Sequence, residues 1–160
     1  MIKFFQINKN KGFTLIEILA VIAILGIISS IIILSLSQFR NEQLLKNTTL
    51  DVVSLLSKAR QNTLSSVNST NYGIHFDSNQ VVLFTGSVYS SNNSTNEPIV
   101  FSSKVNIPIP SGLNIGGGND VIFERLTGET IGGTIKIQLT SDSTKQKIIT
   151  VGKIGNASSN

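Results

Sequence analysis

The chain has 160 residues, enough for one domain of ordinary size, and 40% of them are hydrophobic. It contains no cysteine, which excludes a disulfide framework, a thiolate metal site and a cysteine nucleophile. The formal charge of +4 comes mostly from Lys3, Lys9 and Lys11, because beyond residue 12 there are 10 basic against 9 acidic residues.

The amino-terminal region joins this short basic segment to a long apolar one. Residues 18–36 are 19 positions without a charge, and a helix of that length spans about 28 Å, close to the hydrocarbon thickness of a bilayer. Because lysines precede it and the polar bulk follows it, the positive-inside rule predicts a cytoplasmic amino terminus and an exported remainder. We therefore expect a transmembrane helix over residues 13–39.

A cleaved secretory signal and a plain signal anchor are the alternatives. Ser35-Leu36-Ser37 resembles a cleavage site, but secretory signals have apolar regions of only about 7 to 15 residues. Neither alternative explains Glu17, a carboxylate at the start of the apolar run with no Lys or Arg between Gly12 and Arg40. Since a charge near the membrane interior is costly, we expect Glu17 to have a functional partner.

The stretch Gly12-Phe13-Thr14-Leu15-Ile16-Glu17 resembles the class III signal of type IV pilins and pseudopilins. The resemblance implies that a prepilin peptidase removes residues 1–12 as a leader, cutting between Gly12 and Phe13, and N-methylates Phe13. It also implies that Glu17 of an incoming subunit pairs with the Phe13 amine of its neighbour during assembly. The expected partners are this peptidase, other pilin-like subunits along the amino-terminal helix, and the inner membrane.

The segment after Arg40 predicts a second helical stretch. Apolar or small side chains recur at three- and four-residue spacing, at Leu45, Val52, Val53, Leu56, Ala59 and Thr63. We expect an amphipathic helix over residues 40–66, ending at the polar turn formers that begin at Ser65.

Residues 72–160 predict a β-rich globular head. Tyr72–Phe76 and Val81–Thr85 flank a turn at Asp77–Asn79. A second hairpin pairs Ile135–Leu139 with Ile148–Val151 through a turn at Ser141–Lys145. A long helix followed by strands predicts an α+β fold, with the helix packed on an antiparallel sheet. The resemblance to type IV pilins implies that this fold is pilin-like.

Parts of this head resemble the GspH/FimT-like branch of pseudopilins and minor pilins. The similarity lies in Tyr72-Gly73-Ile74-His75-Phe76 and in the closing stretch "IKIQLTSDSTKQKIITVGKIG". It implies a minor subunit at or near a filament tip, in a type IV pilus or a type II secretion system.

The sequence offers little for catalysis, and we expect neither an enzyme nor a cofactor or metal site. His75 is the only histidine and falls in a predicted strand. Asp120, Glu124 and Glu129 supply oxygen ligands suited to calcium, but they lack the spacing of an EF-hand.

Three lysines near the carboxyl terminus, Lys145, Lys147 and Lys153, are candidate DNA contacts. Some FimT-like minor pilins bind DNA during its uptake, through basic residues in this region. Those members are rich in arginine at the tail, whereas "VGKIGNASSN" has none, and a solvated strand face also explains the lysines. The predicted function is a structural filament subunit; the alternatives are a DNA-binding minor pilin of a competence system and an anchored domain that never polymerises.

Overall fold

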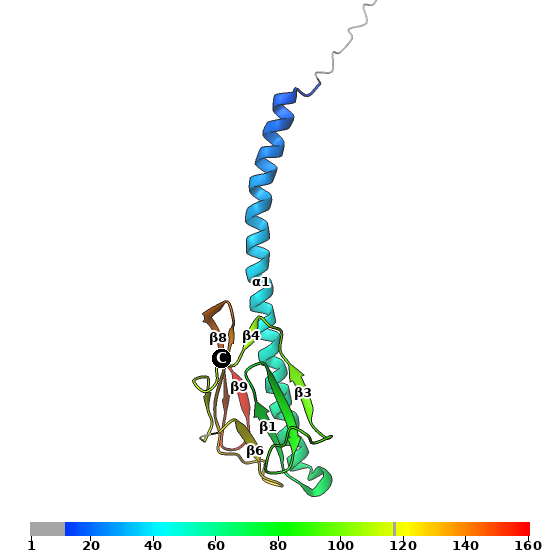
Figure 1. Cartoon of the computed structure of the whole chain (residues 1–160), viewed down its shortest axis with the longest axis vertical. Helices are drawn as coiled ribbons and strands as arrows, with labels where there is room; N and C mark the ends of the chain where they lie inside the picture. Colours follow the sequence, from blue (N-terminus) through cyan, green and yellow to red (C-terminus); the bar gives the residue numbers. More distant parts are fainter. Residues whose placement is uncertain (1–11, 117) are drawn as a thin grey trace, which may run out of the picture. The chain divides into compact units, whose positions relative to one another are not determined.

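A computed structural model describes residues 12–116 and 118–160 (Figure 1). Contacts divide the chain into two compact units, one ending at Phe39 and one spanning Arg40–Asn160. A single helix, α1 (Leu15–Leu64), contributes its first part to one unit and its second part to the other. The predicted leader lies outside the described residues except for Gly12.

The second part of α1 supplies one wall of the head's core. Leu45, Val52, Leu56 and Ala59 are buried, as their spacing predicted. Thr63 is also fully buried, and its hydroxyl donates a hydrogen bond of 2.8 Å to the Ala59 carbonyl, so this buried hydroxyl is satisfied. The helix ends at Leu64 and is followed by the short 3₁₀ turn η1 (Val67–Ser69).

The first sheet contains β1 (Tyr72–Phe76), β2 (Gln80–Thr85), β3 (Glu97–Val100) and β6 (Asp120–Phe123). These strands lie in the order β3-β2-β1-β6, and all neighbours are antiparallel. The predicted β1–β2 hairpin is confirmed, with the Asp77 amide donating a hydrogen bond of 2.9 Å to the Gln80 carbonyl across its turn.

The second sheet contains β4 (Val105–Asn106), β5 (Leu113–Asn114), β7 (Gly133–Leu139), β8 (Asp142–Val151) and β9 (Ala157–Ser159). Its order is β4-β7-β8-β9, with β5 also pairing with β7.

The predicted turn at Ser141–Lys145 is wrong in extent. Strand β8 already begins at Asp142, and the turn is confined to Thr140 and Ser141. The pairing jumps from Gln138 with Gln146 to Leu139 with Asp142, so Ser143, Thr144 and Lys145 bulge from the ladder. Polar residues can extend here because this part of β8 is solvent-exposed and needs no apolar face.

One hydrophobic core joins α1 to both sheets. It combines helix residues such as Leu56 with Ile74 and Phe76 of the first sheet and Ile135 and Ile149 of the second. The α+β, pilin-like fold predicted from the sequence is therefore confirmed, although the strands of the described chain form two sheets rather than one. Strand β7 of the second sheet starts at Gly133, where a φ of 150° and the adjacent Asn114 carbonyl leave no room for a side chain.

Candidate functional site

The start of α1 contains a hydrogen-bonded cap that includes the Glu17 backbone. Thr14 precedes the helix, and its hydroxyl accepts a hydrogen bond of 3.3 Å from the Glu17 amide. Thr14 and Glu17 have the spacing of a capping box, and an acid in the first turn also favours the positive end of the helix dipole. Glu17 thus has a local structural role besides the one implied by the family resemblance. Thr14 was not singled out from the sequence, although the capping-box spacing is visible there.

Gly12 and Phe13 lie in the non-helical stretch immediately before α1, and both are exposed. A peptide bond outside a helix can enter a protease cleft in extended form, so this position suits the predicted cut.

Many apolar side chains follow the predicted cleavage point and lie exposed to solvent. Phe13 is 79% exposed, and the same holds to a lesser degree for Leu15, Ile16, Ile18, Leu19, Val21, Ile22, Ile24, Leu25, Ile27 and Ile28. Exposed apolar surface of this extent marks an interaction with other apolar groups. Among residues 12–116 and 118–160, no helix meets the length and apolarity needed to cross a membrane.

Two of the three candidate DNA-binding lysines share a groove. Lys145 and Lys147 of β8 line it together with Lys46 of α1, and its volume is about 330 Å³. The Lys145 Nζ lies 2.7 Å from a carboxylate oxygen of Glu42, which raises the pKa of Lys145 through a hydrogen bond and through its charge. Lys153 does not line this groove; it follows β8, and its carbonyl accepts a hydrogen bond of 2.9 Å from the Thr130 amide.

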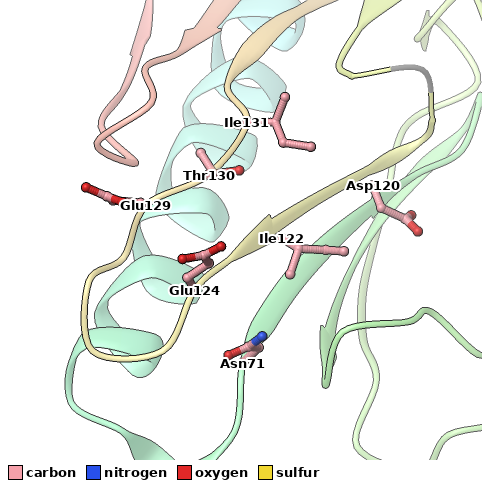
Figure 2. Close-up of a pocket in the computed structure, with 7 residues that line it drawn as sticks. All are labelled: Asn71, Asp120, Ile122, Glu124, Glu129, Thr130 and Ile131. Atoms are coloured by element: carbon pink, nitrogen blue, oxygen red, sulfur yellow. The ribbon is translucent and has the colours of Figure 1, made fainter.

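The three acids considered for calcium lie around another cavity, of about 360 Å³ (Figure 2). Asp120 and Glu124 come from β6 and the residue after it, and Glu129 from the loop that follows. Ile122 and Ile131 give this cavity an apolar part. No group of three or more potential metal-ligating side chains in the described part of the chain is arranged to hold a metal ion.

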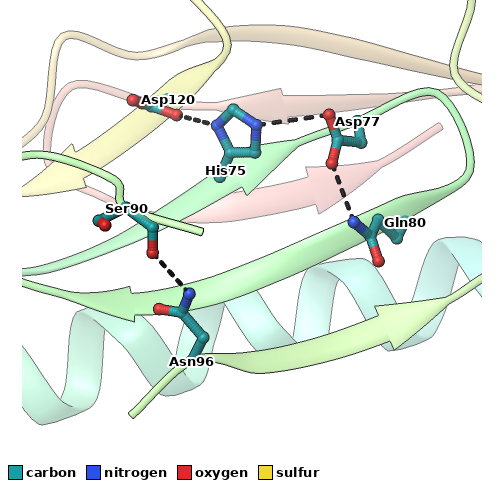
Figure 3. Close-up of polar contacts among 6 residues, drawn as sticks. All are labelled: His75, Asp77, Gln80, Ser90, Asn96 and Asp120. Atoms are coloured by element: carbon teal, nitrogen blue, oxygen red, sulfur yellow. Dashed lines mark hydrogen bonds and ion pairs between the residues drawn. The ribbon is translucent and has the colours of Figure 1, made fainter. Parts of the chain in front are cut away.

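His75 joins three segments of the first sheet (Figure 3). Its Nδ1 lies 2.5 Å from a carboxylate oxygen of Asp120, and its Nε2 lies 3.4 Å from one of Asp77. The ring stacks on Tyr89 with centroids 3.9 Å apart. The prediction that His75 lies in a strand is confirmed, and its contacts indicate a structural link between β1, β6 and the loop after β2.

Comparison with known proteins gives a match to one family model, at the amino-terminal end of the chain. The family model for the prokaryotic N-terminal methylation motif matches residues 7–33. A search of curated proteins found no significant match.

The fold is similar to that of two solved minor subunits. One is the minor pseudopilin EpsH from the type 2 secretion system of Vibrio cholerae, with a TM-score of 0.55 and 12% identity, covering 72% of this chain and 95% of that one. Another is the type IV minor pilin FimU of Pseudomonas aeruginosa, with a TM-score of 0.54 and 10% identity, covering 72% and 92%. At such identities the likeness concerns the fold.

The methylation motif and the pilin-like fold support the same interpretation of this chain. The methylation motif covers residues 7–33 and so overlaps the start of α1, whereas the two solved structures match 72% of the chain. The resemblance inferred from the sequence is thereby confirmed: this chain carries the prepilin-type amino-terminal signal and the pilin-like fold of the type IV pilins and pseudopilins.

Proposed function

We propose that this chain is a structural subunit, of the minor type, in a type IV pilus or a type II secretion pseudopilus. Prepilin peptidase removes residues 1–12 and N-methylates Phe13, and the segment 13–39 then enters the apolar core of the filament. The observation that carries the proposal is the methylation motif at residues 7–33, placed where the long helix of a pilin-like fold begins. Similarity to a pseudopilin and to a pilin supports both kinds of filament equally.

Before assembly, the segment 13–39 is held in the inner membrane, with the amino terminus in the cytoplasm and the head exported. This part of the proposal rests on the uncharged run at residues 18–36 and the lysines ahead of it. During assembly, the exposed apolar side chains from Phe13 to Ile28 exchange lipid for the helices of neighbouring subunits, where close packing stabilises the bundle.

Glu17 sets the axial position of each incoming subunit. Cleavage creates a positively charged amine at Phe13, and Glu17 is the only carboxylate before Glu42. A subunit docked out of register would leave Glu17 in apolar surroundings without a cation, which costs several kcal/mol. One charge in an otherwise apolar helix can therefore disfavour every docking position in which it has no cation beside it.

We do not propose DNA binding. Lys153 lies outside the groove that contains Lys145 and Lys147, and Glu42 offsets part of the positive charge there.

The amino terminus of the mature protein tests the proposal. Mass spectrometry of the membrane-extracted chain, from cells with and without their prepilin peptidase, should show N-methylated Phe13 only when the peptidase is present. Gly12→Val should retain the leader, because a branched side chain obstructs the cleavage site, while Gly26→Ala serves as the control at an open helical position. A wild-type chain that starts at Met1 or after Ser37 in peptidase-containing cells would contradict the proposal.

A further inference from the structure

Strand β6 forms an outer edge of the first sheet, since in the described part of the chain it pairs only with β1. The Phe76 amide donates a hydrogen bond of 2.8 Å to the Asn119 carbonyl, which fixes the hydrogen-bonding pattern between the two strands. In an antiparallel ladder, alternate residues direct their backbone groups to opposite sides of the strand. Asp120 and Ile122 therefore direct their amides and carbonyls away from β1, toward the outer edge.

The chain that returns from β6 toward β7 leaves this edge after one hydrogen-bonded step (Figure 2). The Glu124 amide donates a hydrogen bond of 2.8 Å to the Glu129 carbonyl, but the Thr130 amide donates one of 2.9 Å to the Lys153 carbonyl instead. Among the residues that the structure describes, no backbone hydrogen bond reaches the outward-facing groups of Ile122. An unpaired strand edge is a template on which another chain can pair.

The cavity of about 360 Å³ lies beside this edge. Its lining joins alternate residues of β6, including Asp120 and Ile122, to residues 129–131 of the returning chain. Ile122 and the 73% exposed Ile131 give it apolar surface. The Asp120 carboxylate already has the Nδ1 of His75 at 2.5 Å. A cavity of this volume suits a short peptide segment.

Two further carboxylates stand where the returning chain closes the edge. Glu124 and Glu129 both line the cavity and are exposed, and neither forms a salt bridge with any described residue. Arg125 lies beside Glu124 in the chain, but its guanidinium donates a hydrogen bond of 2.8 Å to the Ser69 carbonyl, and it does not line the cavity. A cation that enters the cavity therefore meets two acids that have no cation of their own.

We propose that the outer edge of β6 binds a short extended segment of a different protein as an added antiparallel strand. The residue opposite Ile122 exchanges two backbone hydrogen bonds with it and packs an apolar side chain against Ile122 and Ile131. A lysine or arginine near the end of the segment reaches Glu124 and Glu129. Strand addition of this kind draws affinity from the main chain and specificity from alternate side chains.

The charge of the site determines which chain can occupy it. A basic segment is attracted and an acidic one is repelled. Pairing of β6 with β6 of a second copy would set the acids Asp120 and Glu124 of one chain against those of the other, and like charges on opposed strands destabilise a sheet. The partner is therefore a chain of different sequence. The site belongs to the head, so this inference does not depend on processing at Phe13 or on filament assembly.

A labelled peptide that alternates threonine with lysine and valine, capped at both ends, is the probe. It is titrated into the purified full-length chain in detergent, and binding is followed by fluorescence anisotropy. At saturation, hydrogen exchange of the Ile122 amide should slow by about tenfold or more, because that amide gains a partner. The Val121 amide, which already faces β1, is the internal control and should change little.

N-methylation of single peptide amides separates strand addition from plain charge attraction. In an antiparallel pair, the residue whose side chain lies beside Ile122 also directs its amide to β6. A methyl group on the amide of the central valine should therefore abolish binding. The same group on the neighbouring threonine, whose amide faces away, should leave the affinity within about threefold.

Substitutions in the protein test the selection by charge. Glu124→Gln and Glu129→Gln should each weaken binding about two- to fivefold, the effect of losing one exposed ion pair. Asp51→Asn removes an exposed acid of α1 outside the cavity and should leave the affinity unchanged. A peptide with glutamate in place of lysine should not bind.

Three results would overturn the proposal. One is an equal effect of the two methylated peptides, which would mean that the peptide binds by its charge alone. Another is unchanged exchange of the Ile122 amide at saturation. The last is slow exchange of this amide in a dimer of the chain without peptide, since a second copy would then occupy the edge.

Discussion

Replacement of Glu17 by glutamine separates its two roles. Glutamine fills the third position of a capping box as well as glutamate does, so the hydrogen bond between the Glu17 amide and the Thr14 hydroxyl is kept. The substitution removes only the charge. If Glu17 acted only on the helix terminus, the substitution would remove the stabilisation from one acidic side chain in the first turn, about 0.3–1 kcal/mol. This corresponds to a factor of at most about five in an equilibrium constant.

Loss of a partner from an ion pair in apolar surroundings is a much larger effect. Breaking such a pair costs about 3–5 kcal/mol, because the remaining charge, here the neighbour's Phe13 amine, stays unmatched. That corresponds to a factor of roughly 10² to 10⁴ in incorporation at equilibrium. We therefore expect Glu17→Gln to be cleaved and methylated normally but nearly absent from filaments.

The assay compares the fraction of subunit in sheared filaments with the fraction in membranes, in cells that lack the native gene. Thr14→Ala is the matched control: it removes the cap, costs about 1 kcal/mol of helix stability and leaves the charge in place. It should be incorporated to within about fivefold of the native chain. If Glu17→Gln enters filaments as well as Thr14→Ala does, the register argument is wrong and Glu17 is a capping residue.

Further predictions concern the head. Leu56→Ala, at a fully buried position on α1, should lower the free energy of unfolding by about 2–5 kcal/mol in urea titration, whereas Leu50→Ala, at a 51% exposed position on the same helix, should stay within about 0.5 kcal/mol. Gly73→Ala places a methyl group 2.5 Å from the Phe84 ring and should lower the free energy of unfolding by about 1–3 kcal/mol. Gly118→Ala, where the nearest atom to the new methyl group is the Asp120 amide nitrogen at 4.0 Å, should not; equal unfolding midpoints would show that the Phe84 ring moves freely. Hydrogen bonds from the side chain and the amide of Thr144 lower the pKa of Asp142 from its ordinary value of 3.8. They therefore stabilise the start of β8 when the pH is above 3.8, and this stabilisation is lost as the pH falls through the lowered pKa. The Thr144 amide resonance should report this acid transition, and Asp142→Asn should abolish it.

Contiguous patterns in the sequence predicted the amino-terminal signal, one buried helix face and the first hairpin. The prepilin signal is a contiguous motif, and its residues need no partner from elsewhere in the fold to be recognised. The spacing of Leu45, Val52, Leu56 and Ala59 likewise predicts a buried helix face from one segment alone. The β1–β2 hairpin was predictable because Asp77–Asn79 supplies turn residues between two apolar strands.

The second hairpin shows where such patterns fail. Polar residues from Ser141 to Lys145 resemble a turn, yet most of them belong to β8, because an exposed strand edge accepts polar side chains on both faces. Nothing local indicated that Ser143–Lys145 would bulge or that Lys145 would meet Glu42, 103 residues earlier.

The amino-acid sequence by itself determined the processing signal, the long helix and the succession of strands, since these depend on neighbouring residues and on the period of apolar side chains. Only the tertiary structure decided that the strands divide into two sheets around one core, that His75 lies between Asp77 and Asp120, and that Lys145 of β8 lies beside Glu42 of α1. These features join residues far apart in the chain, and their positions follow from packing against α1 rather than from any local preference.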